Sequence, residues 1–230
     1  VDLVRFTLRE IAMLESHTTP RHHLLRKAST PGRPLIVYLG GFSQRVELPS
    51  QTHWYDRLPG QWRKNAVTES GLLDLAAKHD LSVCWIASAR RAWAPWWARD
   101  WSERDVLDVV EIGKKENDLL RPSKVFLWGF SDGASLVTYM AAWGLVGDCF
   151  VAHSGLDLAP TLKPNPSWLR GGPLLLVCGS NEPHRVVRAS QEPIRQMYEI
   201  RGRKCELWEL PGLGHEFSAK DSERFLTWCL

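Results

Sequence analysis

Short apolar runs alternate with amphipathic stretches along this chain. A short apolar run predicts a strand buried on both faces, and apolar residues recurring every three or four positions predict a helix. The expected strands cover residues 3–8, 23–27, 35–39, 81–87, 125–128, 149–152, 174–178 and 205–210. The expected helices cover residues 65–79, 102–117, 133–143, 190–201 and 219–230. Strands separated by helices indicate the α/β class, with a mostly parallel sheet flanked by helices on both faces.

Length and composition indicate how many domains the chain forms and argue against several functions. The 230 residues are 44% hydrophobic and 24% charged, which suffices for a sizeable core, so we interpret residues 1–230 as a single domain. A net charge of +3, with acidic and basic residues interspersed, argues against a nucleic-acid partner. The sequence also contains no apolar stretch as long as a membrane span.

The N-terminal segment and the cysteines indicate in which cellular compartment the protein is expected. The N-terminal segment has no signal-peptide core, although the chain begins with Val1, so a leader could precede it. Of the five cysteines, most lie in or beside expected strands, where a small buried thiol is the usual role. No Cys/His pattern has the spacing of a metal site, so we expect neither a metal nor an organic cofactor. These features favour a cytoplasmic protein.

The segment Lys124–Leu136 contains the pattern G-x-S-x-G at Gly129, Ser131 and Gly133. An apolar run precedes it and a helical pattern follows, which is the strand–turn–helix setting of a nucleophile elbow. Such a turn strains its central residue, and flanking glycines remove Cβ atoms that would collide with the neighbouring chain. The serine hydroxyl then stands above the sheet, at the positive end of a helix. Ser131 is therefore the candidate nucleophile, and a serine in an ordinary tight turn is the alternative.

A serine nucleophile needs a base to take its proton, and the base needs a group that orients it. In an open α/β sheet these groups follow later strands, in the chain order Ser, acid, His. His215 follows the last expected strand in a glycine-containing loop and is the expected base. His153 and His184 are the rivals. Because His153 closely follows a strand, a buried structural or supporting role suits it better.

The acid has two candidates, each in a loop after a strand. Glu182 follows the strand expected at 174–178, and Asp157 follows the preceding strand. Chain order alone does not separate them, although position favours Glu182. Asn181 could orient a histidine but has no charge to stabilise an imidazolium. The alternative for Glu182 is a solvated loop carboxylate.

A tetrahedral intermediate also needs two amides aimed at its oxyanion. One should come from Asp132, the residue after the candidate nucleophile. The other should come from the loop after the strand 35–39, where Gly40-Gly41-Phe42 permits close backbone approach. Phe42 is expected to supply this second amide, with Gly41 next. A glycine turn that binds nothing is the alternative.

Together these segments resemble the α/β-hydrolase superfamily over residues 35–230. The stretches Gly-Phe-Ser-Asp-Gly-Ala and Gly-Ser-Asn-Glu-Pro are similar to small capless carboxylesterases of the phospholipase/carboxylesterase, dienelactone-hydrolase-like and polyhydroxybutyrate-depolymerase/feruloyl-esterase-like families. Glu182 stands where these families usually have aspartate, and Gly40 where they have histidine. The resemblance implies an α/β-hydrolase fold without a large lid domain. It also implies that Ser131, His215 and Glu182 hydrolyse carboxylic esters through an acyl-enzyme, without metal or cofactor.

A Trp-rich segment at residues 90–101 is the candidate substrate-binding loop. Its indole side chains are Trp93, Trp96, Trp97 and Trp101. They could form an apolar platform for an acyl or aryl group, and packing of the loop onto a neighbouring helix is the alternative. The expected partner is a small-molecule or polymeric ester. Thioester or peptide hydrolysis, and ligand binding without catalysis, are the other functions open to this fold, and the oligomeric state stays open.

Overall fold

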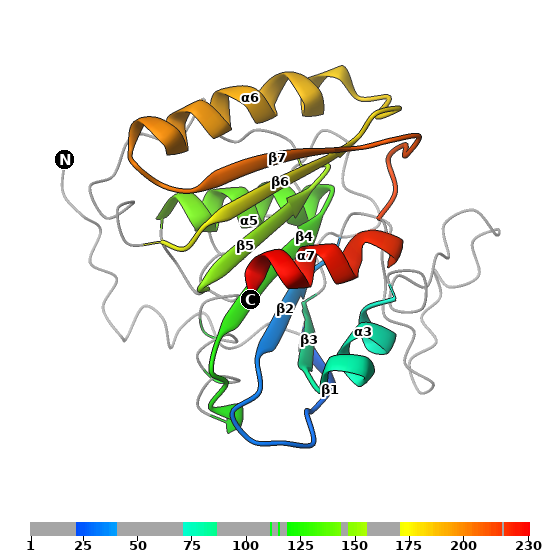
Figure 1. The fold of residues 1–230 in the computed structure, drawn as a ribbon, viewed down its shortest axis with the longest axis vertical. Helices are drawn as coiled ribbons and strands as arrows, with labels where there is room; N and C mark the ends of the chain where they lie inside the picture. The colour runs from blue at the N-terminus through cyan, green and yellow to red at the C-terminus, as the bar shows by residue number, and fades with distance from the viewer. Residues whose placement is uncertain are drawn as a thin grey trace, which may run out of the picture.

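A computed structural model shows the sheet and the helices that cover it (Figure 1). The structure describes residues 22–40, 71–86, 111, 115, 119–143, 147–155, 171–217 and 219–230. The strand expected at residues 3–8 lies outside these ranges. Within them the expected architecture is confirmed, because one mostly parallel sheet has helices on both faces.

Within the described ranges, seven strands form the sheet, in the order β1-β3-β2-β4-β5-β6-β7. Their bounds are β1 His22–Arg26, β2 Leu35–Leu39, β3 Ser82–Ile86, β4 Val125–Phe130, β5 Cys149–His153, β6 Leu174–Gly179 and β7 Cys205–Leu210. Strands β2 to β7 pair in parallel, whereas β1 pairs antiparallel with β3 at one edge. Since parallel strands end at the same edge of the sheet, the loops after β4, β6 and β7 lie together there.

Helices cover both faces of the sheet. Their bounds are α3 Leu72–His79, α5 Asp132–Trp143, α6 Arg185–Ile200 and α7 Ser222–Cys229, with the short 3-10 helix η6 Ala219–Asp221 before α7. One face carries α5 and α6, and the other carries α3 and α7 (Figure 1). Strand β2 shows why both faces are apolar: Leu35, Val37 and Leu39 pack on the α5 side, and Ile36 and Tyr38 on the α3 side.

The start of α6 differs most from the prediction among the described helices. We expected this helix from residue 190, and it begins at Arg185. Its first turn contains valines and its interior contains Pro193, all of which are weak helix formers. Val187 is buried, and Ile194 and Tyr198 pack in the core against the sheet, which nevertheless stabilises the helix. The start of α6 predicted from local helix propensity is therefore wrong, because packing of its side chains decides where the helix begins.

Two other helices also differ at their ends. α3 begins at Leu72, after a left-handed Gly71, although the pattern predicted a start near residue 65. Most of the helix expected at 102–117 lies outside the described residues, but Leu119 and Leu120 are helical beyond its expected end. Among the helices described, none is long and apolar enough to cross a membrane.

Candidate active site

Ser131 occupies a sharp turn between β4 and α5. Its φ of 54° lies in the left-handed region that few residues other than glycine adopt. The Ser131 N–H donates to the carbonyl of His153 at 2.9 Å, and its carbonyl accepts from the N–H of Ser135 at 3.1 Å. The same residue therefore ends the strand pairing and begins the helix, which holds its backbone in the strained conformation.

Two glycines make this turn possible. A Cβ atom on Gly129 would lie 2.5 Å from the carbonyl oxygen of Gly133. A Cβ atom on Gly133 would lie 2.1 Å from the carbonyl oxygen of Leu39. Neither atom could be accommodated, so both positions require glycine. The contact with Leu39 also brings the N-terminus of α5 against the end of β2.

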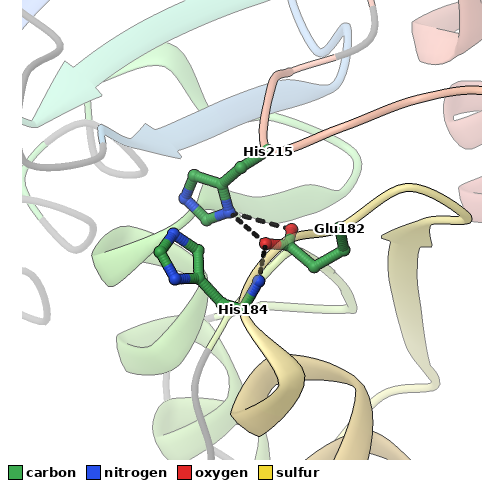
Figure 2. A group of neighbouring side chains, drawn as sticks. All are labelled: Glu182, His184 and His215. Atoms are coloured by element: carbon green, nitrogen blue, oxygen red, sulfur yellow. Dashed lines mark hydrogen bonds and ion pairs between the residues drawn. The ribbon is translucent and has the colours of Figure 1, made fainter.

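A continuous chain of hydrogen bonds joins Ser131, His215 and Glu182. The Ser131 Oγ lies 2.9 Å from His215 Nε2. His215 Nδ1 lies 2.8 Å from one carboxylate oxygen of Glu182 and 3.0 Å from the other (Figure 2). Because a carboxylate only accepts hydrogen bonds, Nδ1 carries the proton and Nε2 presents its lone pair to the serine hydroxyl. The rival acid, Asp157, lies outside the described residues.

Glu182 is a buried carboxylate whose negative charge is well supported. Its side chain has no exposed surface, and Oε1 accepts the backbone N–H of His184 at 3.1 Å. Burial raises the pKa of Glu182. Hydrogen bonds from His215 and from the His184 N–H, together with the His215 charge, lower the pKa by more than burial raises it. The net pKa of Glu182 is below its ordinary value, so the carboxylate stays ionised at neutral pH.

The loops that carry Glu182 and His215 are bonded to each other. A Cβ atom added at Gly179 would lie only 2.1 Å from the Leu213 carbonyl oxygen, so this close approach requires glycine. The Asn181 N–H donates to the same oxygen at 2.9 Å. Asn181 Nδ2 donates to the Gly212 carbonyl at 3.2 Å, and the Gly212 N–H donates to Ser180 Oγ at 2.8 Å. The carboxylate and the imidazole are therefore positioned by one hydrogen-bonded unit rather than by two independent loops.

His153, a rival base in the sequence analysis, lies behind the site in an aromatic cluster. It is fully buried, with ring centroids 5.5 Å from Phe130, 5.4 Å from Phe217 and 6.0 Å from Phe225. Neither of its ring nitrogens has a hydrogen-bond partner within the described ranges. Burial, with a smaller effect from the His215 charge, lowers the pKa of His153 to about 3. The expectation that His153 is a buried histidine is confirmed.

His184, the other rival base, lies beside His215. Their rings are nearly perpendicular, at 88°, with centroids 4.8 Å apart, and His184 is exposed (Figure 2). With Glu182 they form a group whose ligand atoms all lie within 4.8 Å of one another. We missed this group because its members are 182, 184 and 215, and no linear spacing brings out such a pattern. The available signal was the position of His184, directly before α6 and two residues after the expected acid.

The expected oxyanion groups are only partly described. Asp132 is the first residue of α5, and the first N–H groups of an α-helix have no acceptor within the helix. Its amide therefore lies next to Ser131 at the end of the helix that attracts negative charge. The second expected amide, from Phe42 or Gly41, lies outside the described residues. So do the indole side chains proposed to bind substrate, which are Trp93, Trp96, Trp97 and Trp101.

Comparison with known proteins defines the fold. No family model matches the sequence, and a comparison with curated proteins finds no match. Solved structures do match over nearly the whole chain, among them a Bacillus cereus carboxylesterase with a TM-score of 0.65 and 14% identity, covering 96% of this chain and 98% of that one. The fold is that of the α/β-hydrolases.

Two further α/β-hydrolase structures show the same likeness. Esterase PE8 has a TM-score of 0.56 and 18% identity, covering 90% of this chain and 98% of its own. An S-formylglutathione hydrolase from Agrobacterium tumefaciens has a TM-score of 0.55 and 14% identity, covering 90% of this chain and 87% of its own. These matches confirm the α/β-hydrolase fold predicted from the sequence, and the described residues contain no large lid domain.

Proposed function

We propose that this protein is a serine hydrolase that cleaves carboxylic esters through an acyl-enzyme. The observation that carries the proposal is the chain of hydrogen bonds from Ser131 Oγ through His215 to Glu182. A serine, a histidine and a buried carboxylate in this order are the components that activate a hydroxyl nucleophile. The strained backbone of Ser131 supports the same role, because strain of this kind clusters at functional sites.

Each group has a role that follows from its contacts. Ser131 Oγ attacks the ester carbonyl while His215 Nε2 takes its proton, and the ionised Glu182 stabilises the imidazolium that forms. His215 then gives this proton to the departing alkoxide, which leaves as the alcohol. In the second half, His215 takes a proton from water as the water attacks the acyl-enzyme. The proton then returns to Ser131 Oγ as the carboxylic acid leaves.

The developing oxyanion needs donors close to Ser131. The Asp132 N–H is the first, and the backbone after β2 is the proposed source of the second, with Phe42 ahead of Gly41. The close contact of Gly133 with the Leu39 carbonyl supports this assignment, because it places the start of α5 against the end of β2. Preorganised amides at such a position contribute about 3 to 4 kcal/mol of transition-state stabilisation each.

The substrate class is proposed from the similar structures and from the Trp-rich segment. Two of the similar structures are named as a carboxylesterase and an esterase, which favours esters. A third is named as an S-formylglutathione hydrolase, which makes thioesters the second candidate. We propose Trp93, Trp96 and Trp97 as the apolar contacts of the acyl or aryl group. A chain-length panel of p-nitrophenyl esters, extended with feruloyl, polyester and thioester substrates, separates these classes.

A fluorophosphonate probe tests the chemistry directly, because it reacts covalently with activated serines. The wild-type protein should be labelled and should hydrolyse p-nitrophenyl acetate, whereas folded Ser131→Ala should do neither. Labelling that persists in Ser131→Ala would contradict the assignment of the nucleophile. A wild-type protein that is neither labelled nor active would instead favour a ligand-binding role for the fold.

A further inference from the structure

The exposed ring of His184 has no part in the proposed reaction, yet it lies against the candidate base. Figure 2 shows the imidazoles of His184 and His215 side by side, with the Glu182 carboxylate next to both. The ligand atoms of these three residues lie within 4.8 Å of one another. Two imidazoles and one carboxylate form a donor set that proteins use for zinc, with water in the fourth position.

We propose that Glu182, His184 and His215 form an inhibitory binding site for Zn²⁺. The donor set suits this ion, since imidazole nitrogen favours zinc, whereas magnesium and calcium favour sites made of oxygen alone. Zinc bonds to nitrogen and oxygen are about 2.0 to 2.2 Å long, so the ligand atoms must draw closer than in the metal-free arrangement. His184 can supply this movement because its side chain is exposed, while Glu182 is buried and held by the His184 N–H.

Zinc binding and ester hydrolysis exclude each other at this site. Both ring nitrogens of His215 are already used, Nδ1 by Glu182 and Nε2 by Ser131. Zinc at Nδ1 requires the ring proton to move to Nε2, which then cannot take the serine proton. Zinc at Nε2 occupies the lone pair that acts as the base. Zinc at Nδ1 also takes as a ligand the carboxylate that would stabilise the imidazolium.

The inhibition rests on the proposed function, whereas the binding does not. Binding is therefore measured separately, by titrating zinc chloride into metal-free protein in a calorimeter. We expect one zinc ion per chain in the wild type and in Ser131→Ala, with no heat of binding from magnesium chloride. His184→Asn should weaken zinc binding by about tenfold or more, since even changes next to a metal ligand cost 10- to 100-fold.

Inhibition is measured as the ratio of p-nitrophenyl acetate hydrolysis with and without zinc, so that differences in basal activity cancel. The zinc concentration giving half inhibition should rise in His184→Asn by the same factor as the dissociation constant. His79→Asn is the matched control, because His79 also bonds a glutamate, Glu223, at 2.6 Å but lies on α3 away from the site. That variant should match the wild type in zinc binding and in inhibition.

The outcomes separate the two proposals. A wild-type protein without hydrolysis or fluorophosphonate labelling overturns the proposed function, and calorimetry still decides the metal site. An active wild-type protein that binds no zinc overturns the metal site alone. The same conclusion follows if His184→Asn binds zinc as tightly as the wild type, or if bound zinc leaves hydrolysis unchanged.

Discussion

Two histidines contact the ring of Phe130 and have opposite surroundings. The His215 ring is 5.2 Å from Phe130, its side chain is 25% exposed, and both of its nitrogens lie at hydrogen-bond distance from polar groups. The His153 ring is 5.5 Å from Phe130, is fully buried and has neither nitrogen bonded within the described residues. The same side chain is thus hydrogen-bonded and partly exposed at one position, and buried and kept neutral at the other.

The difference shows that the environment of a histidine, rather than its distance from a serine, determines what it can do. A base must accept a proton and have the resulting cation stabilised, and Glu182 provides that charge for His215 alone. His153 is surrounded by Phe130, Phe217 and Phe225, and burial outweighs the opposing charge of Asp221, so its pKa falls to about 3. Four expected effects of substitutions break or sharpen this contrast.

The largest expected effect is the loss of hydrolysis in His215→Ala. Removing the base of a serine–histidine–acid set lowers kcat by on the order of 10⁶, as does removing the serine itself. We expect p-nitrophenyl acetate hydrolysis to fall to background while circular dichroism shows an unchanged fold. His153→Leu is the matched control and should keep its activity. Loss of activity in folded His153→Leu with retention in His215→Ala would reverse the roles of the two histidines.

The second effect concerns the charge that distinguishes the two environments. Glu182→Gln keeps the shape of the side chain but removes the negative charge facing His215 Nδ1. A loss of about 10⁴ in kcat is expected from such a change, because the imidazolium is no longer stabilised and the ring proton is misplaced. Asp157→Asn is the control and should have little effect. If Asp157→Asn were the more damaging variant, the acid would belong to the loop after β5.

The third effect is on stability and concerns His153. The folded state keeps His153 neutral down to about pH 3, whereas the unfolded chain protonates it near 6.5. The unfolded state therefore binds more protons below pH 6.5, and this group makes stability fall with decreasing pH, down to about pH 3. The slope for one such group is about 1.4 kcal/mol per pH unit.

His153→Leu should remove this slope. Urea unfolding between pH 6.5 and pH 5 is the suitable measurement, because Glu182 has a pKa below its ordinary value and stays ionised over that range. At pH 7 the variant should be as stable as the wild type or more so, since two buried nitrogens without a hydrogen-bond partner among the described residues are replaced by apolar atoms of similar volume. An unchanged slope would show that His153 is not kept neutral in the folded state.

The smallest expected effect, on both stability and activity, comes from removing a hydrogen bond between the loops after β6 and β7. Asn181→Ala removes the hydrogen bond to the Gly212 carbonyl but keeps the backbone bond to Leu213. An exposed bond of this kind contributes about 1 kcal/mol, so the urea midpoint and kcat should fall only slightly. Ser180→Ala, which removes the acceptor of the Gly212 N–H, should behave similarly. A fall in kcat as large as that of Glu182→Gln would show that Asn181 acts directly on the imidazole.

Most strands could be predicted because they are continuous apolar runs, and the strand at 205–210 is interrupted only by Glu206 and Glu209. The runs at 35–39, 125–128, 149–152, 174–178 and 205–210 all became strands, with ends that differ by at most two residues. The sequence also led to Ser131, Glu182 and His215, since the elbow pattern is local and the order of strands limits where the partners follow. These features depend on short segments or on chain order, which a sequence displays directly.

Other features arise only when distant segments meet. The antiparallel position of β1 and the early start of α6 depend on packing against the sheet, which local propensity does not encode. The contact between His184 and His215 depends on the hydrogen bonds between the loops after β6 and β7, and no spacing along the chain indicates it.

The missing side chain of Gly179 also limits how this protein can be redesigned. Because the Leu213 carbonyl fills the space where a Cβ atom would lie, the loops after β6 and β7 have matching shapes. A loop grafted from another protein after one of these strands would meet an unaltered partner whose backbone donors and acceptors are placed for the original. Libraries that vary both loops together, with Gly179 kept constant, should therefore contain more folded members than libraries that vary either loop alone.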